Sequence, residues 1–357
     1  MGWGLIGNER AVAALQRALA GGTLAHAYLF VGPARVGKAT LAIKLAQALN
    51  CTADAALSQS AATAGAVTYG GASEPCGECQ PCRRIAAGIH SDVPLITVQP
   101  ADEGLQHKAI SVGQMRDVER AVALNPFEGR TRVIIIDPAD AMNVEAQNAF
   151  LKTLEEPPPN VVFVLVAAGE ERLLPTVRSR CRRVEFRLPP VTDVERGLRE
   201  AGAGPEQARL LARLSRGRAG WALEMARDPP GLERRRQALD SARAPVDMTV
   251  AQRLATAEAM AADFRRDREA VLALLAEWQG WWRDVLLIGS GAETGVANLD
   301  MLSELREDAR RCSRSAVAGF VRALGAARRH LEENVQPRLA LEALLLDVPG
   351  AALISLG

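Results

Sequence analysis

The sequence has almost no net charge. Its 43 lysine and arginine residues nearly balance 42 aspartate and glutamate residues, which leaves a formal charge of +1 over 357 residues. A charge this small sets up no overall field that would draw the molecule onto nucleic acid or an anionic membrane. Any contact with DNA must therefore be local or shared with partner proteins.

Long apolar runs are also missing. No uninterrupted run of eighteen apolar residues occurs, and the N-terminal residues do not place a positively charged segment before an apolar one. We therefore expect a cytoplasmic protein without a membrane-spanning segment. Since 48% of the residues are hydrophobic, a chain of this length can form two or three domains that each bury a core.

Candidate strands are confined to the first half of the chain. Three short, continuously apolar segments, typical of buried strands in a covered parallel sheet, lie at residues 28–31, 133–136 and 161–166. Helical patterns lie between them, and after about Pro190 only helical periodicity remains. This order predicts an α/β layer arrangement followed by a region of helices alone.

The change of pattern divides the chain into three predicted domains. We expect a nucleotide-binding α/β domain at residues 1–188, a small helical lid at 189–235 and a C-terminal helical domain at 240–350. At the end of the predicted lid, the segment DPPGLERRR, residues 228–236, has the composition of a linker.

The predicted C-terminal helical domain contains an amphipathic helix with three tryptophans, for which a buried core position is favoured over ligand binding. This helix carries Val271, Leu274, Leu275, Trp278, Trp281, Trp282 and Val285.

A phosphate-binding loop follows the first candidate strand. The segment GPARVGKAT supplies Gly32, Gly37 and Lys38 in the pattern G-x-x-x-x-G-K and opens a helix. Backbone N–H groups and the positive helix end can hold phosphates there, and the lysine can reach the β- and γ-oxygens of ATP. A chance glycine-rich turn is less favoured, because strand, loop and helix occur in the required order.

Two groups that ATP hydrolysis requires are missing. Ala39 stands where a hydroxyl would ligate Mg²⁺, and Thr40 is turned about 100° further round the helix. Asp137 ends the second candidate strand, where a carboxylate can hold the metal ion, but Pro138 stands where a general base would follow. The sequence thus predicts a degenerate nucleotide site, for which ATP binding without turnover and no binding at all both stay open.

Three motifs together resemble one protein family. They are HAYLFVGP at residues 26–33, NAFLKTLEEPPPN at residues 148–160 and SRC at residues 179–181. In combination they are similar to the bacterial clamp-loader subunits gamma/tau and delta-prime, which belong to the AAA+ class. The resemblance covers residues 1–225, and the remainder agrees in size and helical class. It implies an AAA+ α/β domain, a helical lid and a C-terminal helical collar that joins subunits.

The resemblance also implies partners and a reaction. Clamp loaders of this kind are ring-like hetero-pentamers of gamma/tau, delta and delta-prime subunits, which use ATP to load a sliding clamp onto primed DNA. Each ATP site lies at a subunit boundary and is completed by an arginine from the neighbour's SRC motif, which here is Arg180. Such an arginine finger can accelerate hydrolysis ~10³- to 10⁵-fold. The alternative is an ordinary surface ion pair, as for Arg178, Arg182 and Arg183 around it.

Further departures from the ATP-hydrolysing relatives converge on the nucleotide site. The strand after LEEPPP ends in Ala167 and Ala168 where those relatives have a threonine, and Gly220 stands where a lid arginine would reach the γ-phosphate. This is the pattern expected of the delta-prime branch, which lends an arginine to its neighbour without ATPase activity of its own. An ATP-hydrolysing motor of gamma/tau type is the first alternative, and a zinc-bearing nucleic-acid adaptor that acts alone is the second.

Cysteines form a candidate zinc site. Cys76, Cys79 and Cys82 lie within seven residues, which in a reducing compartment indicates a metal ion and not a disulfide. The resemblance adds Cys51 as the fourth ligand of a closed, structural four-cysteine module, with His90 as the alternative. A redox role for the CxxC pairs is less favoured.

The surroundings of this module, residues 51–82, limit its role. Residues 53–74 are small and polar, which predicts a flexible surface insertion between the ligands. Only Arg83 and Arg84 lie close to the cysteines as basic neighbours. Binding to a phosphate backbone through the module is therefore a minor hypothesis.

Overall fold

A computed structural model of the chain describes residues 2–53, 74–98, 109–333 and 336–349. It separates into two compact units, Met1–Gly197 with Gly217–Trp221 and Leu198–Arg216 with Ala222–Gly357. The region predicted to be the lid contributes residues to both units, and the three-domain boundaries stay a prediction. The predicted insertion lies, apart from its two end residues, outside the described residues.

The first unit is built on a parallel sheet of five strands in the order β2-β3-β4-β1-β5. The strands are β1 (Ala27–Val31), β2 (Leu95–Ile96), β3 (Arg132–Ile136), β4 (Val161–Ala167) and β5 (Arg182–Glu185). The three central strands are the predicted ones, and all their residues are buried. The sequence does not predict the edge strands, because β2 has two residues and β5 buries only Val184.

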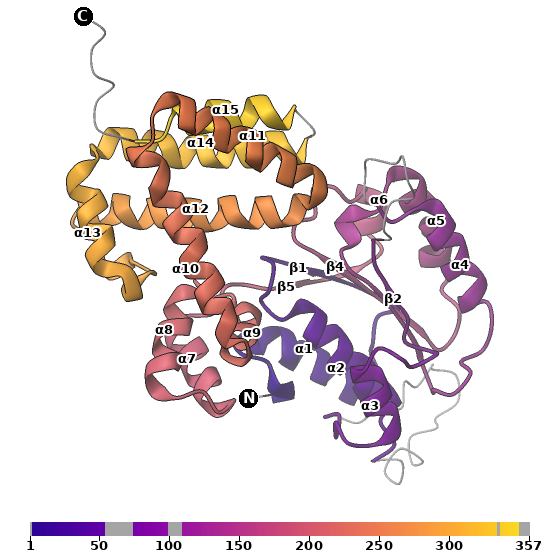
Figure 1. The fold of residues 1–357 in the computed structure, drawn as a ribbon. Coiled ribbons are helices and arrows are strands. Elements are labelled where there is room, and N and C mark those ends of the chain that lie inside the picture. Colours follow the sequence, from indigo (N-terminus) through magenta and orange to yellow (C-terminus); the bar gives the residue numbers. More distant parts are fainter. Residues whose placement is uncertain (1, 54–73, 99–108, 334–335, 350–357) are drawn as a thin grey trace, which may run out of the picture. The chain divides into compact units, whose positions relative to one another are not determined.

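Helices cover both faces of this sheet (Figure 1). They are α1 (Glu9–Ala20), α2 (Lys38–Asn50), α3 (Gln80–Ala86), α4 (Val112–Val122), α5 (Val144–Glu155) and α6 (Pro175–Arg178). Alternate residues of a strand point to opposite faces. Tyr28 and Phe30 of β1 therefore pack in one apolar cluster with α1, α2 and α3, whereas Leu29 packs in another with α4, α5 and α6. The predicted α/β fold class is confirmed.

Beyond β5 the described residues form helices joined by turns. The helices are α7 (Val191–Glu200), α8 (Pro205–Leu214), α9 (Ala219–Arg227), α10 (Pro229–Arg243), α11 (Val250–Arg266), α12 (Arg268–Gly289), α13 (Leu302–Arg311), α14 (Arg314–Glu332) and α15 (Pro337–Leu346). The linker prediction for residues 228–236 is wrong, because α10 begins there. Proline is compatible with the first helical turn, where its missing N–H has no helical partner.

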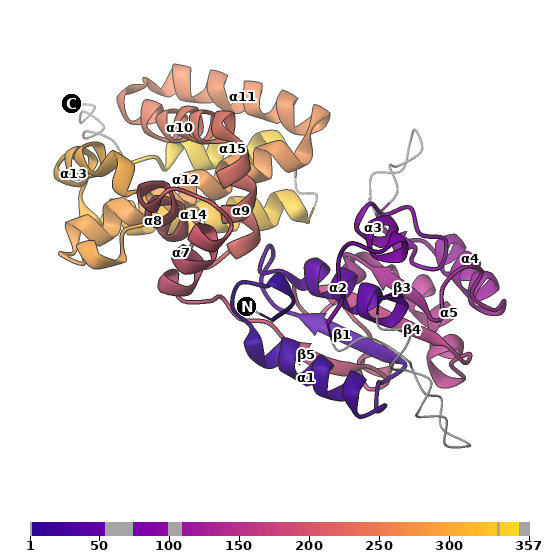
Figure 2. The same ribbon diagram turned by 90° about the horizontal axis from the view of Figure 1, so that it is seen from below.

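Four helices of the second unit, α11, α12, α14 and α15, pack side by side (Figure 2). The tryptophans of α12 are buried, which confirms the predicted core position. The indole N–H groups of Trp278 and Trp281 donate to Ser241 Oγ and Asp308 Oδ2, each at 2.9 Å. A buried indole needs such a partner. The tryptophans therefore serve packing and are not a platform for a ligand.

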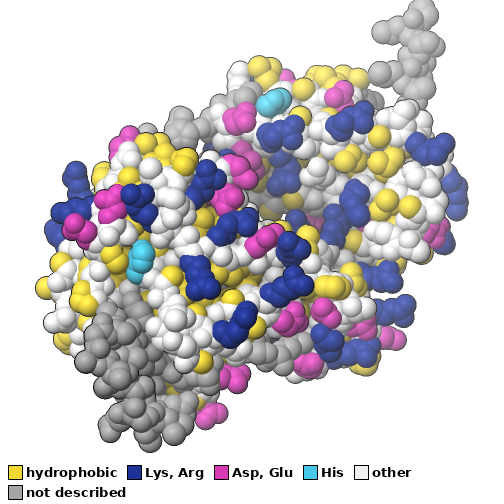
Figure 3. All heavy atoms as spheres, turned by 180° about the vertical axis from the view of Figure 1, so that it is seen from behind, with side chains coloured by type: hydrophobic (Ala, Val, Ile, Leu, Met, Phe, Trp, Pro, Cys, Tyr) yellow, Lys and Arg dark blue, Asp and Glu magenta, His cyan; other side chains and the backbone are white. Residues whose placement is uncertain are grey.

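Side chains of both charges are present on one face of the molecule. On the face displayed in Figure 3, acidic side chains lie among the basic ones. Within the described ranges, the structure contains no helix with the length and hydropathy needed to span a membrane.

Candidate functional site

The phosphate loop connects β1 to α2. Gly32 and Gly37 have φ angles of 150° and 98°, which glycine adopts most readily. A Cβ atom on Gly32 would lie 2.3 Å from the carbonyl oxygen of Phe186, so only glycine fits between β1 and the chain that follows β5. The loop thus has the strand, turn and helix that its sequence predicts.

Lys38 is turned back onto this loop. Its side chain is buried, and its ammonium group donates hydrogen bonds to the carbonyl oxygens of Gly32 and Pro33, the latter at 2.6 Å. Burial lowers the pKa of Lys38, and the carboxylates of Asp137 and Asp140 oppose that shift. The lysine therefore satisfies carbonyl groups of its own loop with two of its three N–H donors, and a phosphate would have to compete with them for these two.

Two carboxylates lie near this lysine. Asp137 follows β3, and burial raises its pKa while the charge of Lys38 opposes the rise. Asp140 lies in the 3-10 turn Ala139–Ala141, and its buried Oδ1 atom has no hydrogen-bond partner among the described residues. The sequence does not indicate Asp140, because no motif assigns a role to the third residue after Asp137.

The substituted positions border the same loop. The Gly32 N–H donates to the carbonyl oxygen of Ala167 at 3.4 Å, and the Gly220 N–H donates to that of Arg35 at 2.8 Å. A Cβ atom on Gly220 would lie 2.9 Å from the Arg35 oxygen, so a larger residue would not fit without a shift. Thr40 is exposed on α2. The structure therefore brings together the loop and the positions where polar groups are missing.

Arg180 follows α6 and forms an ion pair. Its Nη2 donates to Glu155 Oε1 at 2.6 Å, and its Nη1 donates to the carbonyl oxygen of Thr176 at 2.9 Å. The side chains of Arg180 and Glu155 are 34% and 51% exposed, so the pair lies at the surface. The surface pair considered from the sequence is thus present. The sequence does not identify Glu155 as the partner, because the motif LEEPPP does not indicate which nearby arginine its glutamates contact.

The phosphate loop and Arg180 lie at opposite ends of the parallel strands. All strands run parallel, so the loop lies at their carboxyl ends and Arg180, which precedes β5, lies at their amino ends. Arg182 pairs with Tyr28, which lies about 13 Å before Gly32 along an extended strand. Arg180 therefore does not reach the phosphate loop of its own chain.

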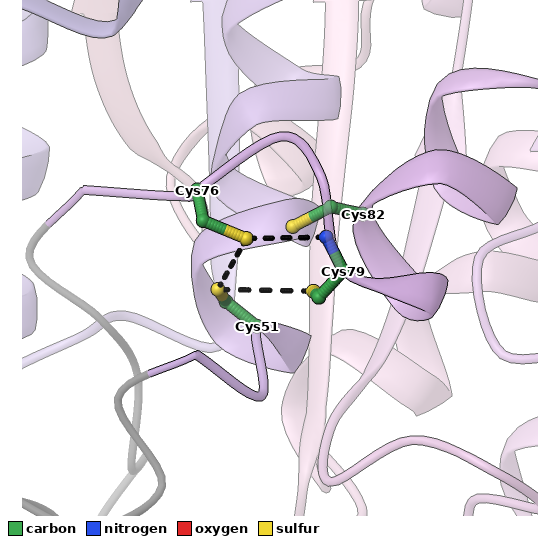
Figure 4. Close-up of side chains that lie close together, drawn as sticks. All are labelled: Cys51, Cys76, Cys79 and Cys82. Carbon is green, nitrogen blue, oxygen red and sulfur yellow. Dashed lines mark hydrogen bonds between the residues drawn. The ribbon is translucent and has the colours of Figure 1, made fainter.

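Four cysteines gather at the end of α2 (Figure 4). Their sulfur atoms all lie within 4.8 Å of one another. The Sγ atom of Cys51 is 3.5 Å from that of Cys76 and 4.0 Å from that of Cys79. In a tetrahedral site with zinc–sulfur bonds of about 2.3 Å, the sulfur atoms are about 3.8 Å apart. The cluster, which Cys82 completes, therefore fits a zinc ion.

His90, the alternative fourth ligand, is engaged elsewhere. Its Nδ1 atom accepts a hydrogen bond from the Asp92 N–H at 3.2 Å and lies 3.7 Å from Glu128 Oε1. Among the described residues, the group of side chains that could hold a metal ion contains Cys51 and not His90. The geometry therefore favours the four-cysteine set over the set with histidine.

The thiols of the cluster differ in acidity. Burial opposes ionisation of Cys79, but hydrogen bonds involving Thr52 and Cys82 outweigh it and lower the pKa of Cys79 to about 6. Burial raises the pKa of Cys51 and of Cys82. Thiolates are the form that binds zinc, so the lowered pKa of Cys79 favours metal binding through this residue.

A buried ion pair, also missed from the sequence, lies at the start of β3. The carboxylate of Asp92 accepts from the backbone N–H groups of Phe127, Glu128 and Gly129 and from Arg132 Nη2, each at 2.8 Å. Burial would raise the pKa of Asp92, but these bonds lower it to about 2. The pair fixes the turn before β3, at the amino ends of the strands.

Comparison with known proteins gives a consistent family. A sequence model of the family described as DNA polymerase III, delta subunit matches residues 7–190. The DNA polymerase III subunit delta' of Pseudomonas aeruginosa is 41% identical over 165 residues, or 46% of this chain and 44% of that protein. The delta' subunit of Bacillus subtilis is 29% identical over 327 residues, or 90% of each chain.

Similarity extends to a related subunit. The gamma/tau subunit of Mycobacterium tuberculosis is 32% identical over 186 residues, which are 52% of this chain and 28% of that protein. This chain thus spans less than half the length of two of these three relatives, and nearly all of the Bacillus subtilis protein.

Proposed function

Because this chain belongs to the family of DNA polymerase III delta subunits, we propose that it acts as a delta-prime-type subunit of a bacterial clamp loader. It joins gamma/tau and delta subunits in a hetero-pentamer that loads the sliding clamp onto primed DNA in the cytoplasm. It has no polymerase or ATPase activity of its own and works as part of the DNA polymerase III holoenzyme. The similarity to a delta' subunit over 90% of both chains supports this choice.

In the assembly, Arg180 donates its guanidinium to ATP bound by a neighbouring subunit. The observation that carries this role is the place of Arg180 at the amino ends of the strands, on the surface and away from its own phosphate loop. A guanidinium presents several N–H donors and stabilises the charge on a transferring phosphoryl group. An arginine that cannot serve its own site can serve one next to it.

The chain's own nucleotide site does not hydrolyse ATP. Two of the three N–H donors of Lys38 are bound to the carbonyl oxygens of Gly32 and Pro33, so a phosphate finds one donor or must compete with these oxygens for the others. Residue 39 supplies no hydroxyl for Mg²⁺, and Pro138 supplies no base. Nucleotide binding through Gly32, Gly37 and Lys38 is compatible with this site, whereas turnover is not supported.

We assign a structural zinc ion to Cys51, Cys76, Cys79 and Cys82. A closed site of four thiolates has no open coordination position and therefore stabilises structure without taking part in catalysis. These residues fasten the segment that begins at Cys76 to the end of α2. Gln47 of α2 supports the same junction, because its Nε2 donates to the Cys82 carbonyl oxygen at 2.7 Å.

An ATP-hydrolysing motor of gamma/tau type is the second candidate. The retained lysine favours it, and so does the carboxylate of Asp140, which interacts electrostatically with Asp137 and Lys38. This candidate requires Asp140 to replace the missing base. It also requires Thr40, which is exposed, to turn toward the metal ion.

ATP hydrolysis distinguishes the two candidates. We would assay the purified chain alone and then assembled with gamma/tau, delta, clamp and primed DNA. The chain alone should be inactive, and the assembly should show DNA-stimulated turnover that Arg180→Ala lowers by the share of the neighbouring site while the pentamer still forms. Turnover by the isolated chain that disappears in Lys38→Ala would identify a motor subunit and overturn the proposal.

A further inference from the structure

Arg180 is held at both ends of its guanidinium group. One nitrogen bonds to the carbonyl oxygen of Thr176, four residues earlier, and the other bonds to the carboxylate of Glu155 from a different helix. The donor that faces Glu155 is thus occupied within the chain's own surface. An arginine in this position must leave its carboxylate before that donor can bind a phosphate.

Glu155 is presented by a well-anchored helix. It is the last residue of α5, whose first turn is capped by the Asn143 side chain, which accepts from the Ala146 N–H at 2.8 Å. On the same helix, Phe150 and Leu154 are buried against the sheet. The carboxylate therefore has a defined origin, although half of the side chain is exposed.

The pairing is selective among the charged residues nearby. Glu156 is exposed, and in the described part of the chain it forms no ion pair with Arg180. Arg183, on β5, pairs instead with Glu170 at 2.9 Å and with Glu185 at 3.6 Å. Of the two adjacent glutamates, only Glu155 therefore holds the arginine of the SRC motif.

We propose that Glu155 is a positioning residue, which holds Arg180 against its own subunit until the phosphates of a neighbour's ATP compete for it. This inference rests on the proposed function of Arg180. An exposed ion pair is weak and is exchanged easily. Phosphate accepts guanidinium hydrogen bonds in the same manner as a carboxylate and carries more charge, so it can displace Glu155. The pair would thereby restrain hydrolysis before the neighbouring site is completed.

The test uses the reconstituted complex with Glu155→Gln, a variant that removes the charge and keeps the shape. We expect ATP turnover without DNA to rise about two- to fivefold, the shift in equilibrium that follows loss of an exposed ion pair. The KM for ATP should stay unchanged. Glu156→Gln is the matched control, because it changes the adjacent glutamate without touching this pair, and its turnover should equal that of the wild type.

Ionic strength supplies a second readout that a merely structural role would not change. Salt screens an exposed ion pair, so the difference between Glu155→Gln and the wild type should shrink at high salt. Equal turnover of both proteins at low salt would overturn the inference, as would a loss of turnover as large as that of Arg180→Ala. If Arg180→Ala itself leaves turnover unchanged, the proposed function fails together with this inference.

Discussion

The two ends of the parallel strands hold their key cation in opposite ways. At the carboxyl ends of the strands, Lys38 is 6% exposed and its ammonium group is bonded to the carbonyl oxygens of its own loop. At the amino ends, Arg180 is 34% exposed and is held by a carboxylate that is itself half exposed to solvent. The first cation is built into the fold, and the second can be exchanged. This difference fits the proposed function, in which a subunit without ATPase activity of its own acts on the ATP of a neighbour.

The largest effect is expected at the amino ends of the strands, where Arg180 lies. Arg180→Ala should reduce ATP hydrolysis at the one neighbouring site that Arg180 completes by about 10³-fold, because the charge on the transferring phosphoryl group loses its partner. The DNA-stimulated hydrolysis of the assembled complex should therefore fall by the share of that site. Thermal unfolding of the isolated chain should change little, since a surface ion pair contributes little stability. Arg183→Ala, which removes another exposed arginine, is the control, and an equal loss in both variants would remove the distinction of Arg180.

Zinc removal should have the next largest effect, on stability and not on chemistry. Cys51→Ser should abolish stoichiometric zinc and lower the free energy of unfolding by on the order of 4 kcal/mol, because a structural metal contributes its binding energy to folding. Metal analysis and denaturant unfolding measure both. Cys312→Ser is the control outside the cluster. Full zinc content in Cys51→Ser would show that Cys51 is not a ligand.

The turn before β3, which Asp92 holds in place, should make the free energy of unfolding depend on pH. The pKa of Asp92 is about 2 in the folded chain and about 3.9 when unfolded. Its contribution is therefore complete above about pH 4 and is lost as the pH falls toward 2. The difference corresponds to about 2–3 kcal/mol. Asp92→Asn should flatten the stability profile between these pH values, whereas Asp117→Asn, at an exposed site, should not.

The smallest effect is expected at the carboxyl ends of the strands, where Lys38 lies. Lys38→Ala should lower the free energy of unfolding by about 1–3 kcal/mol, because two loop carbonyl groups lose their donor. It should leave the ATP turnover of the complex unchanged. Lys44→Ala, which removes a lysine from the same helix, is the control for loss of helix surface. A strong loss of ATP turnover by the complex in Lys38→Ala alone would mean that the phosphate loop of this chain is also a working nucleotide site.

Residue patterns along the chain were sufficient for much of the fold. The three central strands are buried on both faces and are therefore continuously apolar, so they are visible in the sequence. The edge strands are not, because β2 is short and β5 is mostly exposed. The start of α10 resembles a linker in sequence, because two prolines and a glycine break a helix everywhere except in its first turn, and the sequence does not show where that turn lies.

The sequence by itself determined the fold class, the phosphate loop with its missing groups, and the cysteines, because each depends on residue types at short spacings. Only the tertiary structure decided which distant groups meet. It placed Cys51 with the other cysteines and His90 apart from them, bonded Lys38 to its own loop, and paired Arg180 with Glu155. Such contacts join residues whose separation in the chain carries no signal, because the packing of helices on the sheet sets them.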